Sequence, residues 1–265
     1  MCGYVGFTNR IENADAVLGE MMDIIRHRGP DSEGKYIDDG IALGFRRLSI
    51  IDLAQGDQPI ANEDGGKVLV FNGEIYNYRQ LREKLVAAGH VFKTHSDSEV
   101  LLHGYEEYGV KLLNMLRGMF SFVIWDKEKQ ELFGARDYFG IKPLYYAEMN
   151  GTLLFGSEIK AFLPHPQFEK KLNLSTLENY LTFQYSPLSD TFFEGVKKLM
   201  PAHYFLYKDG KMEITRYWEP NFENDESKSL EDWVGEIRKT FEGSVEAHKI
   251  SDVEVGSFLS SGIDS

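Results

Sequence analysis

Apolar stretches of strand length occur in groups along this chain, and they do not alternate regularly with helical segments. One group extends from residue 119 to residue 155, and two further pairs lie before and after it. The strands predicted in these groups are 34–37, 41–48, 119–125, 131–135, 144–147, 152–155, 203–207 and 211–217. Parallel sheets need a crossover, usually a helix, between neighbouring strands, so this grouping favours antiparallel sheets and helices in separate layers, an α+β fold.

The composition indicates a chain with one large core and a small-molecule partner. With 265 residues, of which 42% are hydrophobic, it suits one domain or one domain plus part of another. No apolar run approaches the roughly 18 residues of a spanning helix, and no secretory signal is recognisable, so we expect a cytoplasmic protein. The net charge of −13 disfavours nucleic acid and anionic membranes, and a single cysteine excludes an internal disulfide or a multi-cysteine metal site.

That single cysteine, Cys2, directly follows Met1 at the start of a predicted strand over residues 2–8. Removal of Met1 would leave a thiol and a free α-amine on one residue. A thiol attacks as its thiolate and has an ordinary pKa of about 8.5, whereas an α-amine titrates near 7.7 to 8.0. The amine can therefore accept the thiol proton, directly or through a water, as in N-terminal threonine nucleophiles. The alternative is that Cys2 packs as a small hydrophobic residue.

The dipeptide Asn72-Gly73 follows the apolar run 68–71. Between two alternating strands it would predict a hairpin turn. The sequence after it is helical instead, with a capping box at Asn77 and Gln80. We therefore expect a strand-to-helix loop, in which the side chain of Asn72 and the backbone N–H of Gly73 can point at one ligand atom and form an oxyanion hole.

Charged residues near predicted element ends have both structural and functional interpretations. A second capping box predicts a helix over residues 96–108, with Asp97 in its first turn. An acid there complements the helix dipole by about 0.3 to 1 kcal/mol, and a functional role would require a cationic ligand group. The basic residues 26–28 are explained by a helix C-terminus in the same way. Arg47 ends a predicted strand, and a guanidinium can bind a carboxylate through two parallel N–H bonds.

The composition changes at residue 219. We interpret residues 219–229 as a linker, 230–248 as a helix and 254–259 as a strand that leads into the Ser/Gly-rich loop 260–265. A strand followed by such a loop is an arrangement that cradles phosphates. A plain flexible tail would have a similar composition.

Eight motifs together resemble, in order and spacing, the glutamine-hydrolysing asparagine synthetases. They are MCGYVGF, RHRGPDS, FRRLSIID, FNGEIYN, SDSEVLL, LRGMFSFVIWD, ARDYFGIKPLYY and FGSEIKA. The resemblance implies a glutaminase domain over residues 1–218 with the N-terminal-nucleophile hydrolase fold, a four-layer αββα sandwich of two antiparallel sheets. After the linker, residues 230–265 would be the truncated start of an ATP-dependent synthetase domain, an incomplete α/β segment like that of ATP pyrophosphatases.

The same resemblance places the nucleophile at Cys2 and assigns the glutamine pocket. The pocket residues would be Arg47, Leu48, Ser49, Ile50, Ile51, Asn72, Gly73, Glu74 and Asp97. Arg47 is expected to bind the α-carboxylate of glutamine, and Asp97, assisted by Glu74, its α-ammonium group. The side-chain amide is thereby delivered to Cys2.

Attack by the thiolate would give a tetrahedral oxyanion held by Asn72 and Gly73. Collapse releases ammonia and leaves a γ-glutamyl thioester that water hydrolyses. We expect no metal or other cofactor for this reaction. In the full-length enzymes of the family, ATP and Mg²⁺ activate aspartate, and the ammonia reaches it through a tunnel.

The resemblance also assigns an incomplete ATP site. Its residues would be Leu259, Ser260, Ser261, Gly262, Asp264 and Ser265. Ser261 stands where the usual family loop, Ser-Gly-Gly-x-Asp-Ser, has its first glycine, and the added Cβ restricts the backbone. The chain ends within this loop, so we expect it to hydrolyse glutamine at best. The segment after residue 219 would lack its sheet and leave an apolar edge that is disordered or forms the contacts of a homodimer.

Two alternatives remain open. Glucosamine-6-phosphate synthases and amidophosphoribosyltransferases carry the same kind of glutaminase domain, although the strand and loop predicted after the linker disfavour both. Outside enzymes, the chain would be a catalytically silent glutamine-binding or assembly module, above all if Met1 is retained and blocks the amine.

Overall fold

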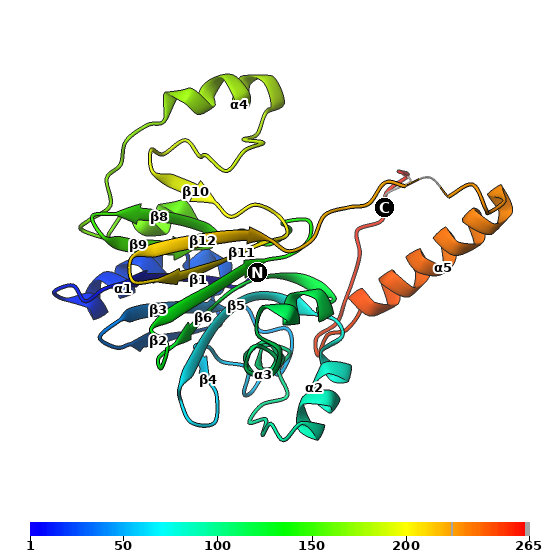
Figure 1. Ribbon diagram of the computed structural model, residues 1–265, viewed down its shortest axis with the longest axis horizontal. Helices are drawn as coiled ribbons and strands as arrows, with labels where there is room; N and C mark the ends of the chain where they lie inside the picture. The colour runs from blue at the N-terminus through cyan, green and yellow to red at the C-terminus, as the bar shows by residue number, and fades with distance from the viewer. Residues whose placement is uncertain (224, 263–265) are drawn as a thin grey trace.

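Two six-stranded antiparallel sheets lie face to face at the centre of the structure (Figure 1). The computed structural model describes residues 1–223 and 225–262. In spatial order, the first sheet contains β10 (Val196–Lys198), β8 (Tyr145–Met149), β9 (Thr152–Gly156), β1 (Gly3–Thr8), β3 (Ile41–Arg47) and β2 (Ser32–Ile37). The second contains β12 (Lys211–Arg216), β11 (His203–Lys208), β7 (Glu131–Arg136), β6 (Gly118–Asp126), β5 (Lys67–Ile75) and β4 (Ile60–Ala61).

Helices cover the outer face of each sheet. The first sheet packs against α1 (Ala14–Ile24) and the 3₁₀ turns η1 (Arg26–Arg28) and η3 (Ile159–Phe162). The second packs against α2 (Tyr78–Ala87), α3 (Glu99–Tyr108) and the 3₁₀ turn η2 (Gly109–Met115). Outside these layers lie η4 (Leu174–Thr176), α4 (Leu177–Phe183) and α5 (Leu230–His248) (Figure 1). The predicted α+β sandwich of four layers is thus confirmed.

The central strands are buried on both faces because their side chains alternate between two cores, whereas the edge strands β2 and β12 are half-exposed or exposed. In β1, the side chain of Tyr4 enters the core between the sheets, whereas Val5 and Phe7 pack toward α1. The Tyr4 hydroxyl donates a hydrogen bond to Ser121 Oγ of β6 at 3.0 Å. The central strand of the first sheet is therefore joined to the second sheet by a polar contact as well as by the apolar core.

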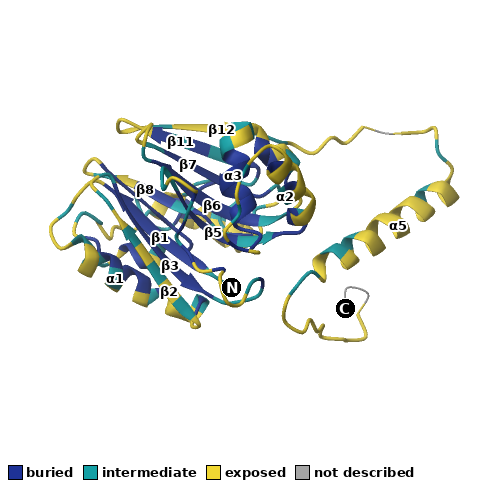
Figure 2. Ribbon diagram, turned by 90° about the horizontal axis from the view of Figure 1, so that it is seen from below, coloured by how far each residue is buried: buried dark blue, intermediate teal, exposed yellow. Residues whose placement is uncertain are grey.

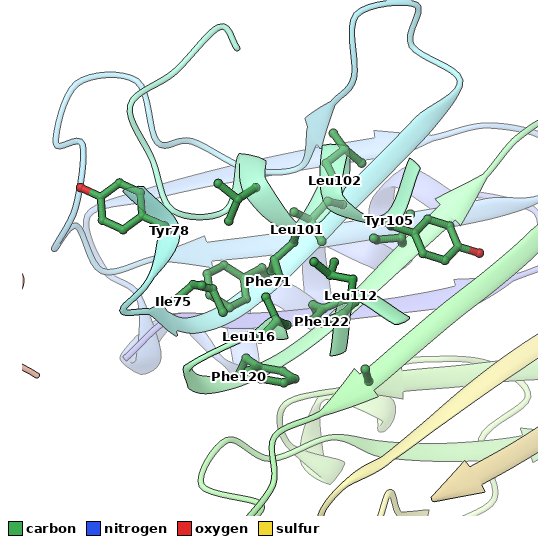
Figure 3. Packing of buried hydrophobic residues seen from close by; sticks show 14 of the residues in the cluster. Phe71, Ile75, Tyr78, Leu101, Leu102, Tyr105, Leu112, Leu116, Phe120 and Phe122 are labelled. Carbon is green, nitrogen blue, oxygen red and sulfur yellow. The ribbon is translucent and has the colours of Figure 1, made fainter. Parts of the chain in front are cut away.

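The second sheet shows the same alternation. The side chain of Phe71 in β5 faces α3 together with Phe120 and Phe122 of β6 (Figure 3). The neighbouring residues Val70 and Val123 enter the core between the sheets. This packing fixes the orientation of β5, which carries part of the candidate site.

The residues before α2 differ from the prediction. Asn77 precedes the helix, but its side chain forms no capping bond. Its Nδ2 donates to the carbonyl of Met115 at 2.8 Å, and its Oδ1 accepts from the N–H of Arg117 at 2.9 Å. The expected capping box is wrong because this amide joins two neighbouring loops instead.

The segment after the sandwich is exposed and only partly regular (Figure 2). Helix α5 has the predicted range and begins with a capping box of Ser229 and Asp232. It buries no side chain, and Ile237 and Phe241 are exposed. The strand predicted over 254–259 is absent from the described chain, because no second strand lies there to pair with it. The domain boundaries themselves remain predictions.

Among the described helices, none combines the length and apolar composition needed to cross a lipid bilayer.

A cross-strand contact in the core between the sheets generates a test of this packing. Gly134 of β7 lies opposite Phe205 of β11, and a Cβ on Gly134 would come 2.2 Å from the phenyl ring. We expect Gly134→Ala to lower the free energy of unfolding by about 1 to 3 kcal/mol through overpacking. Urea denaturation measures the change, and Phe205→Leu in the same chain should restore part of the loss.

The matched control is Gly235→Ala, on the exposed surface of α5, where a Cβ would have no atom within 4 Å. It should leave the unfolding of the sandwich unchanged. Equal stability of wild type and Gly134→Ala would contradict the described contact.

Candidate active site

Cys2 lies directly before β1, the central strand between β9 and β3. Its sulfur accepts a hydrogen bond from the N–H of Leu48 at 3.4 Å and lies 3.4 Å from the carbonyl oxygen of the same residue. Burial raises the pKa of the Cys2 thiol, and the Leu48 N–H opposes the shift in part. The thiol is therefore neutral near pH 7 and needs a base before it can attack.

Arg28 holds the backbone of Cys2 in place. Its Nε donates to the Cys2 carbonyl at 2.9 Å, and its Nη1 forms an ion pair with Glu158 at 3.0 Å. A side chain at Gly3 is excluded, since a Cβ there would come 2.9 Å from the Arg28 side chain. Sequence reasoning missed Arg28 because a helix end accounted for its charge. The signal that could have found it is the RHRGPDS motif.

Asn72 and Gly73 lie inside a strand. β5 continues through both residues and stays paired with β6 as far as Ile75, so the predicted strand-to-helix loop is wrong. Asn72 is only 1% exposed, and its Nδ2 has no hydrogen-bond partner among the residues that the structure describes. A buried donor without a partner costs about 1 to 3 kcal/mol. A ligand oxygen would satisfy it.

These groups converge on two adjoining cavities. The larger, of about 360 Å³, is lined by Cys2, Asn72, Gly73 and Glu74 among others. The smaller shares Cys2, Ile50, Gly73 and Glu74 with it and extends the site to further predicted residues, namely Arg47, Leu48, Ile51 and Asp97. Ser49 lines neither of these two cavities, and its N–H donates to Asp31 at 2.8 Å. The roles given to all these residues remain predictions.

Arg47 organises the loop that closes the smaller cavity. Its guanidinium donates to the carbonyls of Ile51 and Leu53, each at 3.3 Å, and to that of Asp52. It also forms an ion pair with Asp57 at 3.1 Å. The loop after β3 is therefore folded around a buried cation at the wall of the cavity.

Two carboxyl groups face the same cavity. Asp97 accepts a hydrogen bond from the N–H of Ile75 at 2.8 Å, and burial raises its pKa. Burial also raises the pKa of Glu74, and the nearby charge of Asp97 adds to this shift. Both effects penalise the ionised carboxylates in the ligand-free site. A cationic ligand group would relieve them.

The helix after Asp97 begins later than predicted. α3 starts at Glu99, and its N-cap, Ser98, makes no side-chain capping bond. The carboxylate of Glu99 turns back to accept the N–H of Thr94 at 2.8 Å. The predicted capping box is therefore wrong, and Asp97 precedes the helix instead of lying in its first turn.

Lys142 is a further charged residue that sequence reasoning did not single out. It lines the larger cavity, and its Nζ lies 3.3 Å from the sulfur of Met1. Burial lowers the pKa of Lys142, while the charge of Glu74 opposes the shift. Only the motif ARDYFGIKPLYY carried a signal for this residue.

The segment after α5 covers part of the site. Asp252 donates its N–H to the carbonyl of Ile50 at 3.0 Å and accepts the N–H of Asp52 at 2.8 Å. Residues 253–256 line the larger cavity, as does His248, whose ring centroid lies 4.2 Å from that of Tyr76. A segment from beyond the predicted linker is thus part of the wall, which no local pattern indicated.

The predicted ATP residues do not join this site. Leu259, Ser260, Ser261 and Gly262 are exposed and belong to no helix or strand. Asp264 and Ser265 lie outside the described residues. The assignment of an ATP loop therefore stays a prediction.

Two protein families match consecutive parts of the chain. Residues 1–218 match the glutamine amidotransferase domain, and residues 236–265 match asparagine synthase.

Curated relatives align with all of this chain. It is 44% identical over 271 residues to glutamine-hydrolysing asparagine synthetase 1 of Bacillus subtilis, and 39% identical over 293 residues to a putative asparagine synthetase of Mycobacterium tuberculosis. It is also 37% identical over 284 residues to amidase chry2 of Gibberella zeae. The alignments cover 100% of this chain but only 43%, 44% and 42% of these relatives, so the chain spans less than half of their length.

Solved structures share the fold. The glutamine phosphoribosylpyrophosphate amidotransferase of B. subtilis superposes with a TM-score of 0.60 at 21% sequence identity. An allosteric regulatory enzyme of purine biosynthesis gives a TM-score of 0.63 at 20% identity. Each alignment covers 83% of this chain and 50% of the other chain.

The buried carboxyl pair generates a stability prediction. Because the pKa of Glu74 is raised, its contribution to folding is favourable at low pH and is lost as the pH rises through the raised pKa. Glu74→Gln removes a charge that is costly at high pH. We expect it to raise Tm by a few °C at about pH 9, and by less at about pH 6.

Differential scanning calorimetry of the ligand-free protein measures this difference. Glu83→Gln, at an exposed position of α2, is the matched control and should show no such pH-dependent gain. A gain for Glu74→Gln that is the same at both pH values would contradict the predicted cost of the buried charge.

Proposed function

Since this chain belongs to the glutamine amidotransferase domain family, which matches residues 1–218, we propose that it hydrolyses the side-chain amide of L-glutamine to glutamate and ammonia. One observation carries the proposal. The sulfur of Cys2, directly before β1 of the first sheet, faces the same cavity as Nδ2 of Asn72 in the second sheet, which has no partner among the described residues. A thiol beside a buried hydrogen-bond donor is the arrangement that acyl transfer requires.

The charges around the cavity orient the substrate. The carboxylates of Glu74 and Asp97 attract the α-ammonium of glutamine, and Arg47 attracts its α-carboxylate. Both charged groups on the α-carbon of glutamine are thereby paired with groups of opposite charge, and the side-chain amide extends toward Cys2. Positioning of this kind removes much of the entropic cost of the reaction.

In the reaction, the α-amine freed by removal of Met1 takes the proton of the Cys2 thiol. The thiolate forms a bond with the amide carbon, and the carbonyl electrons move to the oxygen, which accepts hydrogen bonds from Asn72 Nδ2 and the Gly73 N–H. The ammonium proton passes to the leaving nitrogen, the C–N bond breaks and ammonia departs. Water then cleaves the thioester, releasing glutamate and restoring the thiol.

In a longer protein, we propose, this ammonia amidates aspartate in an ATP-dependent asparagine synthetase reaction. The support is that residues 236–265 match asparagine synthase and that the relatives carry this name. ATP and Mg²⁺ would belong to that later part. Residues 259–262 are exposed here and form no phosphate cradle, so we derive no step through the nucleotide.

Composition favours the cytoplasm as the location of this protein. The exposed apolar residues of α5 favour a contact with the remainder of a longer chain or with a second copy of this one.

A second candidate is the catalytically silent glutamine-binding module. It requires that Met1 be retained, in which case the Met1 side chain lies at the larger cavity and contacts Lys142. With Met1 in place, the nitrogen of Cys2 is part of a peptide bond and cannot accept a proton. The two candidates therefore differ in the processing of the amino terminus.

Ammonia release from glutamine, measured on protein whose intact mass shows loss of Met1, tests the proposal. We expect activity in the wild type and none in Cys2→Ala. Asn72→Ala should lower kcat by about 10²- to 10³-fold with a small change in KM, because the amide acts on the oxyanion. Asn221→Ala, at an exposed position before α5, is the matched control. Processed wild type that binds glutamine but releases no ammonia would instead support the silent module.

The carboxyl pair predicts the pH dependence of substrate binding. Because burial raises the pKa of Asp97 and of Glu74, both take up protons before ordinary carboxyl groups do as the pH falls. The α-ammonium of glutamine then loses its anionic partners. The KM for glutamine should therefore rise as the pH falls from about 8.5 to about 6. Asp97→Asn should raise KM throughout and flatten this dependence. A KM that is constant across this range would contradict the assignment.

A further inference from the structure

Two histidines and several glutamates meet on the helical side of the second sheet, and none of them lines either cavity of the active site. His103 comes from α3, His90 from the loop after α2, and Glu63 from the turn between β4 and β5. One ligand atom from each of these three residues lies within 4.8 Å of those of the other two. His103 is fully buried, whereas the side chain of Glu63 is 36% exposed. The cluster is therefore built into the fold and still open to an ion from solvent.

The separations within the cluster suit a four-coordinate metal ion. His103 Nδ1 lies 3.6 Å from Glu63 Oε2 and 3.0 Å from Glu106 Oε2, and His90 Nδ1 lies 3.8 Å from the same oxygen of Glu106. Ligands at about 2.0 to 2.1 Å from a tetrahedral zinc ion are about 3.3 to 3.4 Å apart. The observed values lie on both sides of this distance. Small side-chain adjustments would bring them to it.

The outer nitrogen of each imidazole is held by a further carboxylate. His103 Nε2 lies 3.4 Å from Glu99, and His90 Nε2 lies 3.4 Å from Glu107. In the ligand-free protein, His103 Nδ1 carries a proton that it donates to Glu106 Oε2 at 3.0 Å, and a metal ion would displace this proton. With the ion bound, a proton on each Nε2 leaves each Nδ1 to coordinate it. Metal-binding histidines commonly have such a carboxylate partner, which fixes the tautomer and the orientation of the ring.

The outer oxygens of the two carboxylates are held as well. Glu63 Oε1 accepts the N–H of Val91 at 2.9 Å, and Glu106 Oε1 accepts from Asn62 Nδ2 at 2.7 Å. In both residues, Oε2 is the oxygen that faces the histidines. Each of the two carboxylates thus presents its Oε2 to His103, and Glu106 presents the same oxygen to His90 as well.

We propose that His90, His103, Glu63 and Glu106 bind a divalent transition-metal ion of the zinc class. The mixed imidazole and carboxylate donors favour Zn²⁺ and its neighbours over Mg²⁺ and Ca²⁺, which prefer oxygen ligands throughout. Four protein ligands leave no open position, so the site is structural. It joins the turn at Glu63 and the loop at His90 to α3, directly after the segment that carries Asp97.

Direct metal titration tests this site. The Cys2→Ala variant is used throughout, because an N-terminal thiol and amine would bind metal on their own. After chelator treatment, calorimetric titration with Zn²⁺ should show one ion per chain and an increase in Tm. Co²⁺ in its place should give the strong visible absorption of tetrahedral coordination.

His90→Ala and Glu63→Gln should each weaken Zn²⁺ binding at least about tenfold. The side chains of His90 and Glu63 are 15% and 36% exposed, so these changes disturb the core less than a change of the fully buried His103 would. His203→Ala, on β11 and outside the cluster, is the matched control and should bind as tightly as its parent. No binding, or equal affinity of all variants with octahedral Co²⁺ spectra, would overturn the proposal. The active site would be untouched by that result, since ammonia release does not depend on this cluster.

Discussion

The position of the amino-terminal strand constrains the whole structure. β1 lies between β9 and β3 in the middle of a sheet, with β1 side chains packed into cores on both of its faces. A strand in this position cannot move without disrupting both cores. Cys2, directly before β1, is therefore held in place by this strand and by its contacts with Arg28 and Leu48. The candidate nucleophile near the amino terminus is thereby positioned by the sheet.

The site exists because two sheets face each other. Cys2 directly precedes β1 of the first sheet, whereas Asn72 and Glu74 belong to β5 of the second. Their relative placement depends on the apolar core between the sheets and on the hydrogen bond from Tyr4 to Ser121. The core that stabilises the domain also positions the residues of the candidate active site, so packing defects far from the cavity should affect the proposed reaction.

Much of this architecture follows from local patterns in the sequence, and the predictions failed where contacts between distant segments decide the structure. The hairpins and α5 were predictable because alternation and turns are local. The prediction of a loop at Asn72 failed because pairing of β5 with β6 overrides the turn preference of Asn-Gly. The predicted strand 254–259 failed for the opposite reason, since a strand needs a neighbour. Arg28 and Lys142 were missed because only tertiary structure brings them to Cys2.

The continuation of β5 through Asn72 has a consequence for how this domain can fail. Neighbouring side chains of a strand point to opposite faces, so a shift of β5 by one residue along β6 would turn the amide of Asn72 away from the sulfur. Such a slipped form would keep most of its backbone pairing. A sample with a native circular dichroism spectrum would then contain inactive molecules. The turnover number per chain would detect a shifted strand register more sensitively than any measurement of secondary structure.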